Sequence, residues 1–153
     1  MTLQKEELTT DISKMLILGS GSSARKELLN SIGIVPDRVE IPDVDESPRA
    51  NENPRQYVKR IAIEKANSIV SDEQSYLITA DTIVTAGKKL LMKASDEETV
   101  QEYLKLLSGR RHSVYTAFCV KHRGLVNFKL VRTVLRMRLL TEKEIIAYIA
   151  CGE

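Results

Sequence analysis

The chain has 153 residues, 42% of them hydrophobic and 29% charged, with a net charge of +2. This is the usual size of one domain with one core, and the composition argues against a disordered chain. The small net charge gives no indication of a nucleic-acid partner, and no apolar stretch is long enough to span a bilayer.

The amino-terminal stretch MTLQKEELTTDISK is charged and lacks the apolar run of a signal peptide. It predicts a polar extension over residues 1–14, followed by one domain over residues 15–153, in a cytoplasmic protein. Cys119 and Cys151 are far apart and lack metal-ligand spacing, so both are expected to be free thiols.

The first half of the chain predicts alternating strands and helices. A short apolar run at Met15–Leu18 fits a buried strand, and Arg25–Ile32 continues with leucines at helical spacing. Ile34–Ile41 fits a second strand, and the stretch PDVDESPRANENP that follows it is typical of a loop, acidic at its start. From Pro54 to Ile69, apolar residues recur every three or four positions, which predicts a helix with proline in its first turn.

The middle of the chain predicts a hairpin and a further helix. A strand is expected over Tyr76–Val84, with the polar pair Asp81 and Thr82 inside it. The sequence GKKL fits a tight turn that leads to a short strand at Leu90–Lys93. We expect Ser95 to cap a helix over 96–107, whose first turn is acidic.

The last segments alternate apolar and polar residues. Ser113–His122 and Val126–Leu139 fit two strands of a hairpin that turns near Arg123 and Gly124. Thr141 then opens a capping box with a glutamate three residues later, which predicts a final helix. The order of elements predicts a mixed α/β fold built around one long twisted sheet.

The loop GSGSSA after the first strand satisfies the loose dinucleotide pattern GxGxxA. Gly19 and Gly21 follow a strand and open a helix, and Glu40 lies where a ribose-binding acid is expected in a Rossmann fold. The pattern is common by chance, so a dinucleotide-binding oxidoreductase is one interpretation and a plain surface loop is another.

The same loop is also suited to bind several phosphates. Ser20 and Ser22 offer hydroxyl groups, and Arg25 and Lys26 place two cations at the start of the helix. These side chains fit a triphosphate better than the single pyrophosphate bridge of a dinucleotide.

Two groups of carboxylates are candidates for metal and water chemistry. Asp43, Asp45 and Glu46 alternate along an acidic loop and can converge on a hard cation such as magnesium, although a solvated acidic loop has the same pattern. Asp81 lies inside an apolar strand, so we expect it to be partly buried, where a carboxylate needs a charged, metal or hydrogen-bonding partner.

Three further cations are candidates for contacts with phosphate. Lys65 lies on the apolar side of its helix, Lys93 ends a short strand, and Arg110 belongs to the turn SGRRHSVYT. Each could instead keep its charge in solvent. Phosphate-binding groups, carboxylates and no covalent nucleophile motif together favour metal-assisted attack of water on a phosphoanhydride.

The order LILGSGSSARKELL, PDVDES, YVKRIAIEKA, ITADTIV, KLLMKASD, LLSGRRHSVYT and EKEIIAYI resembles the Maf (septum formation protein) family of nucleoside triphosphate pyrophosphatases. The resemblance implies a Maf/ITPase-like fold, with helices packed on a long mixed sheet and a cleft between two lobes. It also implies a cytoplasmic enzyme, often homodimeric, that hydrolyses nucleoside triphosphates with a divalent cation, magnesium or manganese.

The resemblance also implies roles for individual residues. Asp81 would accept a proton from water, with Lys65 beside it among the catalytic groups. Asp45 or Glu46 would hold the metal together with Asp81. The substrate would be bound by Ser20, Ser22, Arg25, Thr82, Lys93 and Arg110. The segment SGRRHSVYT is similar to the branch of the family that acts on dTTP, UTP and modified pyrimidine nucleotides.

Two departures from the family pattern bear on function. The family loop usually reads SPRR, whereas here Ser23 and Ala24 precede Arg25 without the proline and the first arginine. Family members also continue beyond the position of Glu153, so the resemblance implies a domain that is incomplete at its carboxyl end. The expected function is removal of noncanonical nucleotides, and the alternative is an inactive remnant that at most binds nucleotide.

Overall fold

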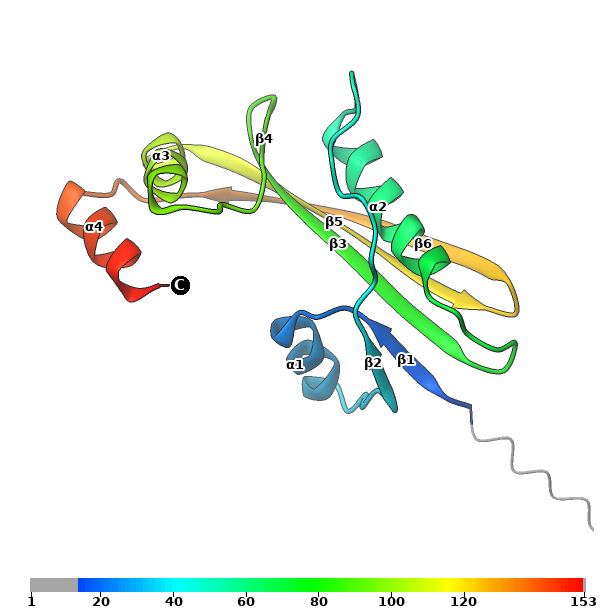
Figure 1. The fold of residues 1–153 in the computed structure, drawn as a ribbon. Coiled ribbons are helices and arrows are strands. Elements are labelled where there is room, and N and C mark those ends of the chain that lie inside the picture. The colour runs from blue at the N-terminus through cyan, green and yellow to red at the C-terminus, as the bar shows by residue number, and fades with distance from the viewer. Residues whose placement is uncertain (1–13, 153) are drawn as a thin grey trace, which may run out of the picture.

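The computed structural model describes residues 14–152, so the predicted polar extension lies outside the described residues except for Lys14. Among these residues, no helix has the length and apolar character needed to cross a membrane. The elements, in chain order, are β1 (Leu16–Gly19), α1 (Ser23–Ser31), β2 (Arg38–Glu40), α2 (Pro54–Ser68), β3 (Tyr76–Ala86), β4 (Lys89–Leu91), α3 (Glu97–Leu107), β5 (Arg111–His122), β6 (Leu125–Arg136) and α4 (Glu142–Cys151) (Figure 1).

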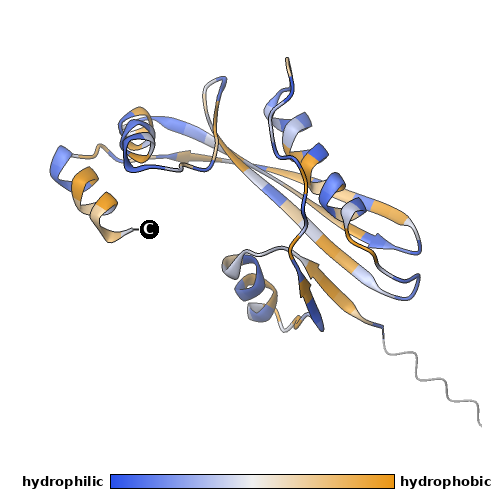
Figure 2. Ribbon diagram, viewed as in Figure 1, coloured by the Kyte–Doolittle hydropathy of each residue, from blue (hydrophilic) through white to orange (hydrophobic). Residues whose placement is uncertain are grey.

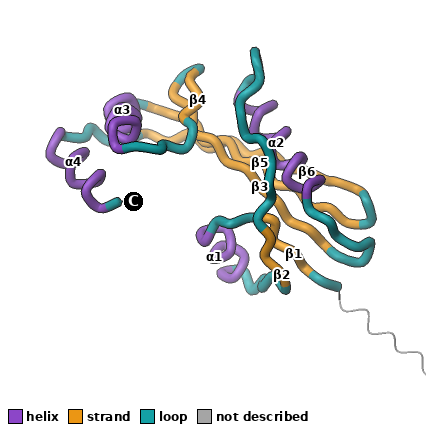
Figure 3. Tube along the Cα trace, viewed as in Figure 1, coloured by secondary structure: helices purple, strands orange, loops and turns teal. Residues whose placement is uncertain are grey.

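The strands form one mixed sheet in the order β2-β1-β3-β5-β6, with β4 paired to β3. Strand β1 runs parallel to both β2 and β3, whereas β4, β5 and β6 pair in antiparallel fashion. Figure 3 shows the long strands β3, β5 and β6 crossing the molecule, with α3 and α4 at one end. The predicted mixed α/β fold around a long sheet is therefore confirmed.

One edge of β3 is shared between two short strands. Residues 76–79 pair with β1, and residues 84–86 pair with β4. Between them, residues 80–83 have no strand partner on that edge within the described chain, although β5 pairs with them on the other edge. The sheet therefore forks at Asp81 and Thr82, and side chains can enter the gap from both branches.

Helix α2 covers one face of the sheet and forms the main core with it (Figure 1). It begins with a capping box in which Asn53 and Gln56 satisfy each other's backbone amides. Its buried face, which includes Val58 and Ile61, packs against Ala117 and other side chains of β3 and β5. Figure 2 shows α2 with both hydrophilic and hydrophobic residues, as an amphipathic helix requires.

The predicted β5–β6 hairpin is confirmed, and its turn has a clear backbone cause. Arg123 and Gly124 have φ angles of 50° and 74°. Positive φ at both central residues is the signature of a type I′ turn, whose twist matches that of the flanking strands. The predicted capping box of the last helix is also present, between Thr141 and Glu144.

Two sequence predictions need correction. The strand expected over Ile34–Ile41 is only Arg38–Glu40, because Pro36 has no amide hydrogen for a strand ladder. The cap of α3 is Asp96 instead of Ser95: an Asp96 carboxylate oxygen accepts the Thr99 amide at 2.7 Å. A carboxylate reaches the amides of the first turn and also complements the helix dipole.

Candidate active site

A cavity of about 590 Å³ lies at the fork of the sheet. Its walls come from the β1–α1 loop, the loop before α2, α2 itself, β3 and the segment after β4. It brings together candidate residues that are far apart in the sequence: Ser20, Ser22, Arg25, Glu46, Lys65, Asp81, Thr82 and Lys93.

Lys65 occupies the centre of this site between two carboxylates. Its Nζ donates to Asp81 Oδ1 at 2.9 Å and forms an ion pair with Glu46 Oε1 at 2.7 Å. Lys65 and Asp81 are only 7% and 6% exposed, whereas half of the Glu46 side chain is exposed. The two carboxylates therefore face the same ammonium, one from the core and one from solvent.

Burial raises the pKa of Asp81 above its ordinary value of 3.8, although the hydrogen bond and charge of Lys65 oppose this shift. Desolvation disfavours the charged carboxylate, and the nearby ammonium favours it. Asp81 consequently binds a proton more tightly than an exposed aspartate does. This is the property that a general base needs near neutral pH.

The β1–α1 loop and the start of α1 present hydrogen-bond donors to the cavity. Ser22 caps α1 by accepting the Arg25 amide, and the Arg25 guanidinium donates to Ser20 Oγ at 3.0 Å. A second nitrogen of Arg25 donates to Thr82 Oγ1 at 3.5 Å, and Thr82 in turn shares a hydrogen bond with Thr116. A helix N-terminus together with a guanidinium is a recurrent arrangement for binding phosphate.

Gly19 is explained by close packing at the end of β1. A Cβ at this position would lie 2.6 Å from the Thr79 Cγ2 atom and 2.7 Å from the Ile69 Cδ1 atom. Both neighbours are core side chains, so only glycine lets β1 approach β3 here. The first glycine of the GxGxxA pattern thus has a structural reason that requires no dinucleotide.

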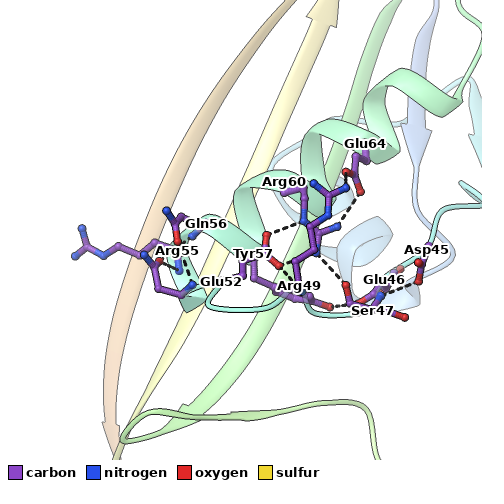
Figure 4. Close-up of polar contacts among 11 residues, drawn as sticks. Asp45, Glu46, Ser47, Arg49, Glu52, Arg55, Gln56, Tyr57, Arg60 and Glu64 are labelled. Atoms are coloured by element: carbon purple, nitrogen blue, oxygen red, sulfur yellow. Dashed lines mark hydrogen bonds and ion pairs between the residues drawn. The ribbon is translucent and has the colours of Figure 1, made fainter.

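The acidic loop, residues 42–53, is fastened to α2 by polar contacts (Figure 4). The Tyr57 hydroxyl donates to the Glu46 carbonyl at 2.9 Å, and Arg60 donates to the Ser47 carbonyl at 3.0 Å. Arg60 also contacts both carboxylate oxygens of Glu52, at 2.6 and 2.7 Å. The bonds to the Glu46 and Ser47 carbonyls hold the backbone at Glu46 and at the residue after it, next to the carboxylate that pairs with Lys65.

Sequence reasoning missed this fastening. The helical periodicity over residues 54–69 did not single out Tyr57 or Arg60, and Glu52 belongs to the loop before that helix. One available signal was the spacing of Arg60 and Glu64, which pair at i and i+4 with an N–O distance of 3.0 Å. The pairing with Glu52 had no such signal, because it depends on the path of the loop.

Two predicted site residues lie outside the cavity lining. Asp45 lines a neighbouring cavity with Arg49, and its carboxylate accepts the Ser47 amide at 2.9 Å. Hydrogen bonds from Ser47 lower the pKa of Asp45. Arg110 lies in the turn just before β5, where its amide donates to the Leu107 carbonyl. Over residues 14–152, no three metal-ligating His, Cys, Asp or Glu side chains cluster closely enough to hold an ion by themselves.

Comparison with curated proteins finds closely related sequences named as pyrophosphatases. A "dTTP/UTP pyrophosphatase" of Roseobacter denitrificans is 45% identical over 135 residues, covering 88% of this chain and 72% of that protein. A protein of the same name from Zymomonas mobilis is 42% identical, covering 93% of this chain and 71% of its own length. A "Nucleoside triphosphate pyrophosphatase" of Neorickettsia sennetsu is 42% identical, with 94% and 69% covered.

Among solved structures, the Staphylococcus aureus Ham1 protein matches with a TM-score of 0.51 at 14% identity, covering 80% of this chain and 70% of that one. This likeness concerns the fold alone and confirms the predicted Maf/ITPase-like architecture. The family model described as "Maf-like protein" matches residues 15–153. Together with the level of identity to the curated relatives, this match shows that the chain belongs to the Maf-like protein family.

Proposed function

We propose that this chain hydrolyses nucleoside triphosphates to the monophosphate and pyrophosphate, with dTTP, UTP or modified pyrimidine nucleotides as substrates. The names of the relatives support this substrate class. The observation that carries the proposal is the buried Lys65 held between Asp81 and Glu46, in a cavity whose other wall offers phosphate-binding donors.

The triphosphate is bound on the β1–α1 side of the cavity. Ser20 and Ser22 offer hydroxyl groups, and Arg25 offers a guanidinium that its hydrogen bond to Ser20 already orients. Lys93 adds a second cation from the segment after β4. Prearranged donors of this kind stabilise the charge that develops on phosphate oxygens.

Asp81 accepts the proton of the attacking water. Its raised pKa makes it a stronger base than an exposed aspartate, and Lys65 keeps it ionised. As the water oxygen bonds to phosphorus, the bond between the α- and β-phosphates breaks, and pyrophosphate leaves. Lys65 also orients the Asp81 carboxylate through the hydrogen bond to Oδ1.

A divalent cation fits the donor set at this site. Magnesium in phosphate-processing sites is typically held by one or two carboxylates and the substrate's own oxygens. Glu46 and Asp81, which converge on Lys65, would supply the carboxylates. When bound, the cation would neutralise phosphate charge. Asp45 and Arg110, the homodimer and the cytoplasmic location remain predictions from the family resemblance.

Hydrolysis is favoured over a dinucleotide-binding oxidoreductase and over nucleotide binding without catalysis. The three relatives described above are all named as pyrophosphatases and none as an oxidoreductase. The prepared base at Asp81 favours catalysis over nucleotide binding alone. Removal of noncanonical nucleotides is the cellular role that we propose for this activity.

The test is pyrophosphate release from dTTP, UTP, CTP and modified pyrimidine nucleotides, with magnesium or manganese. We expect metal-dependent release from the wild type and a loss of about 10²- to 10⁴-fold in Asp81→Asn. Glu73→Gln is the matched control, because it also converts a carboxylate to an amide but lies exposed in the loop before β3. It should keep wild-type activity.

Two outcomes would contradict the proposal. Unchanged release by Asp81→Asn would remove Asp81 from the chemistry. Absence of release from wild-type protein whose folding is verified by circular dichroism would favour the binding-only alternative.

A further inference from the structure

The Arg25 guanidinium is held by hydroxyl groups from two different segments of the chain. One of its nitrogens donates to Ser20 Oγ at 3.0 Å, in the β1–α1 loop, and another donates to Thr82 Oγ1 at 3.5 Å, on β3. Because the guanidinium is planar and rigid, two contacts fix its rotation better than one does. The orientation of Arg25 in the cavity therefore depends on the Thr82 hydroxyl.

Thr82 can accept from Arg25 only when its own hydroxyl hydrogen points elsewhere. A threonine hydroxyl has one hydrogen to donate and two lone pairs, whereas a guanidinium has donors only. Thr116 lies directly opposite Thr82 on β5, and the two Oγ1 atoms are 3.0 Å apart. When Thr82 donates its hydrogen to Thr116, its lone pairs remain available to Arg25.

Thr116 is one strand removed from the ligand-binding space. Among the described residues, the lining of the active-site cavity includes Arg25 and Thr82 but not Thr116. Thr116 is linked to that lining through its hydrogen bond with Thr82. A pair of threonines on facing strands also stabilises a sheet by itself, so a test has to separate the two roles.

We infer that Thr116 is a positioning residue for phosphate binding: its hydroxyl directs the Thr82 hydroxyl and, through it, orients Arg25. This inference rests on the proposed function, since it takes the triphosphate to lie at Arg25. A guanidinium that is already oriented loses less side-chain freedom when phosphate arrives, so phosphate binds more tightly. A polyphosphate without base or sugar is enough to detect this effect.

The test compares Thr116→Val, which keeps the shape of the side chain without the hydroxyl, with Thr116→Ser, which keeps the hydroxyl. Binding of inorganic tripolyphosphate is measured by calorimetry with magnesium, in the Asp81→Asn background that slows turnover. Thr133→Val is the matched control, because it is the same substitution at an exposed position of β6. Urea unfolding of each variant measures any change in the stability of the sheet.

We expect Thr116→Val to weaken tripolyphosphate binding by about 3- to 10-fold, the effect of losing one hydrogen bond. Thr116→Ser should bind within about twofold of the parent, and Thr133→Val should bind as the parent does. Adding Thr116→Val to Thr82→Val should cause no further loss, because Thr116 acts through Thr82. With Asp81 intact, kcat/KM for pyrophosphate release from dTTP should fall in Thr116→Val by a similar factor.

Three results would overturn the inference. Unchanged binding by Thr116→Val, or equal losses in Thr116→Val and Thr116→Ser, would leave Thr116 as a structural residue of the sheet. A further loss on adding Thr116→Val to Thr82→Val would show that Thr116 does not act through Thr82.

Failure of this inference is distinguishable from failure of the proposed function. Weaker tripolyphosphate binding in Thr116→Val alone, in a protein that releases no pyrophosphate with Asp81 intact, would support the positioning role and remove only the hydrolysis. Absence of tripolyphosphate binding by the parent would overturn both.

Discussion

Helix α2 carries two ion pairs, a partly buried one at Arg60 and a buried one at Lys65, and they have different effects on the pKa of the paired carboxylate. Two nitrogens of the Arg60 guanidinium donate to the two carboxylate oxygens of Glu52, at 2.6 and 2.7 Å. This hydrogen bonding lowers the pKa of Glu52 to about 2. Lys65 makes one hydrogen bond of 2.9 Å to Asp81, and burial still raises the pKa of that group.

The difference shows how one helix can serve both stability and reactivity. A bidentate guanidinium–carboxylate pair holds its carboxylate ionised over almost the whole pH range, which suits a structural contact. A single ammonium contact does not fully offset desolvation, so Asp81 retains affinity for a proton. The Arg60–Glu52 pair holds the acidic loop against α2, and the Lys65–Asp81 pair leaves a carboxylate in the cavity that can accept a proton.

The largest effect is expected from Lys65→Met, which removes the ammonium and keeps an unbranched side chain that is one atom shorter. Pyrophosphate release should fall by at least about 100-fold, because the Asp81 carboxylate is no longer oriented or kept ionised by the ammonium. The free energy of unfolding at neutral pH should fall by about 3 kcal/mol, because Asp81 is left buried without its partner. Steady-state kinetics and urea unfolding measure the two losses.

The stability loss in Lys65→Met should shrink as the pH is lowered. Without the ammonium, the pKa of Asp81 rises further, so the folded state takes up a proton before the unfolded state does. Activity within threefold of wild type would show that Lys65 is a structural residue only.

The second prediction concerns the other pair. Arg60→Ala should lower the free energy of unfolding by about 2 to 3 kcal/mol, because the Glu52 carboxylate and the Ser47 carbonyl both lose their hydrogen-bond donor. It should also raise the magnesium concentration needed for half-maximal release, because the backbone next to Glu46 is no longer held.

Arg49→Ala is the matched control for Arg60→Ala. Arg49 also pairs with Glu64, at 2.9 Å, but two thirds of its side chain is exposed. Its removal should change the free energy of unfolding by less than about 1 kcal/mol. Equal losses in the two variants would show that burial does not distinguish these ion pairs.

The third prediction is that Glu52 and Asp81 contribute to the free energy of unfolding with pH dependences of opposite sign. The pKa of Glu52 falls from 4.5 to about 2 on folding, so its contribution is complete above pH 4.5 and is lost as the pH falls toward 2. Glu52→Gln should therefore be less stable than wild type at pH 6, with a deficit that narrows on acidification.

Asp81→Asn should behave in the opposite way. Because folding raises the pKa of Asp81 above 3.8, ionisation of this group makes the wild type less stable as the pH rises. As the pH rises from 3 to 7, the free energy of unfolding of Asp81→Asn should therefore increase relative to that of the wild type. Urea unfolding between pH 3 and pH 7 measures both variants, and slopes of the same sign would contradict the contrast.

The smallest effect is expected from Tyr57→Phe, which removes one hydroxyl and keeps the buried ring. The lost hydrogen bond to the Glu46 carbonyl should cost about 1 kcal/mol of unfolding free energy and raise the magnesium requirement by no more than about threefold. A tenfold rise would mean that Tyr57, and not Arg60, is the main attachment of the acidic loop.

Much of the fold could be predicted because its signals are local. The spacing of apolar residues between Pro54 and Ile69 and the capping box at Thr141 each depend on neighbouring residues, and each has its counterpart in the structure. The burial of Asp81 also followed from its apolar neighbours.

What the sequence did not predict depends on contacts between distant segments. The open edge of β3 results from β1 ending at Gly19 and β4 ending at Leu91, which no local pattern reveals. The attachment of Glu46 requires the acidic loop to fold back on Arg60.

The pairing of β3 with β5 affects when the active site can form during synthesis of the chain. The lining of the active-site cavity is complete in the sequence once Lys93 has been synthesised, yet one edge of β3 pairs with β5, which begins at Arg111. Contacts between segments so far apart form slowly, because a long loop must close first. We therefore expect the site to be unformed on the ribosome until the β5–β6 hairpin has emerged, with Asp81 exposed to solvent until then.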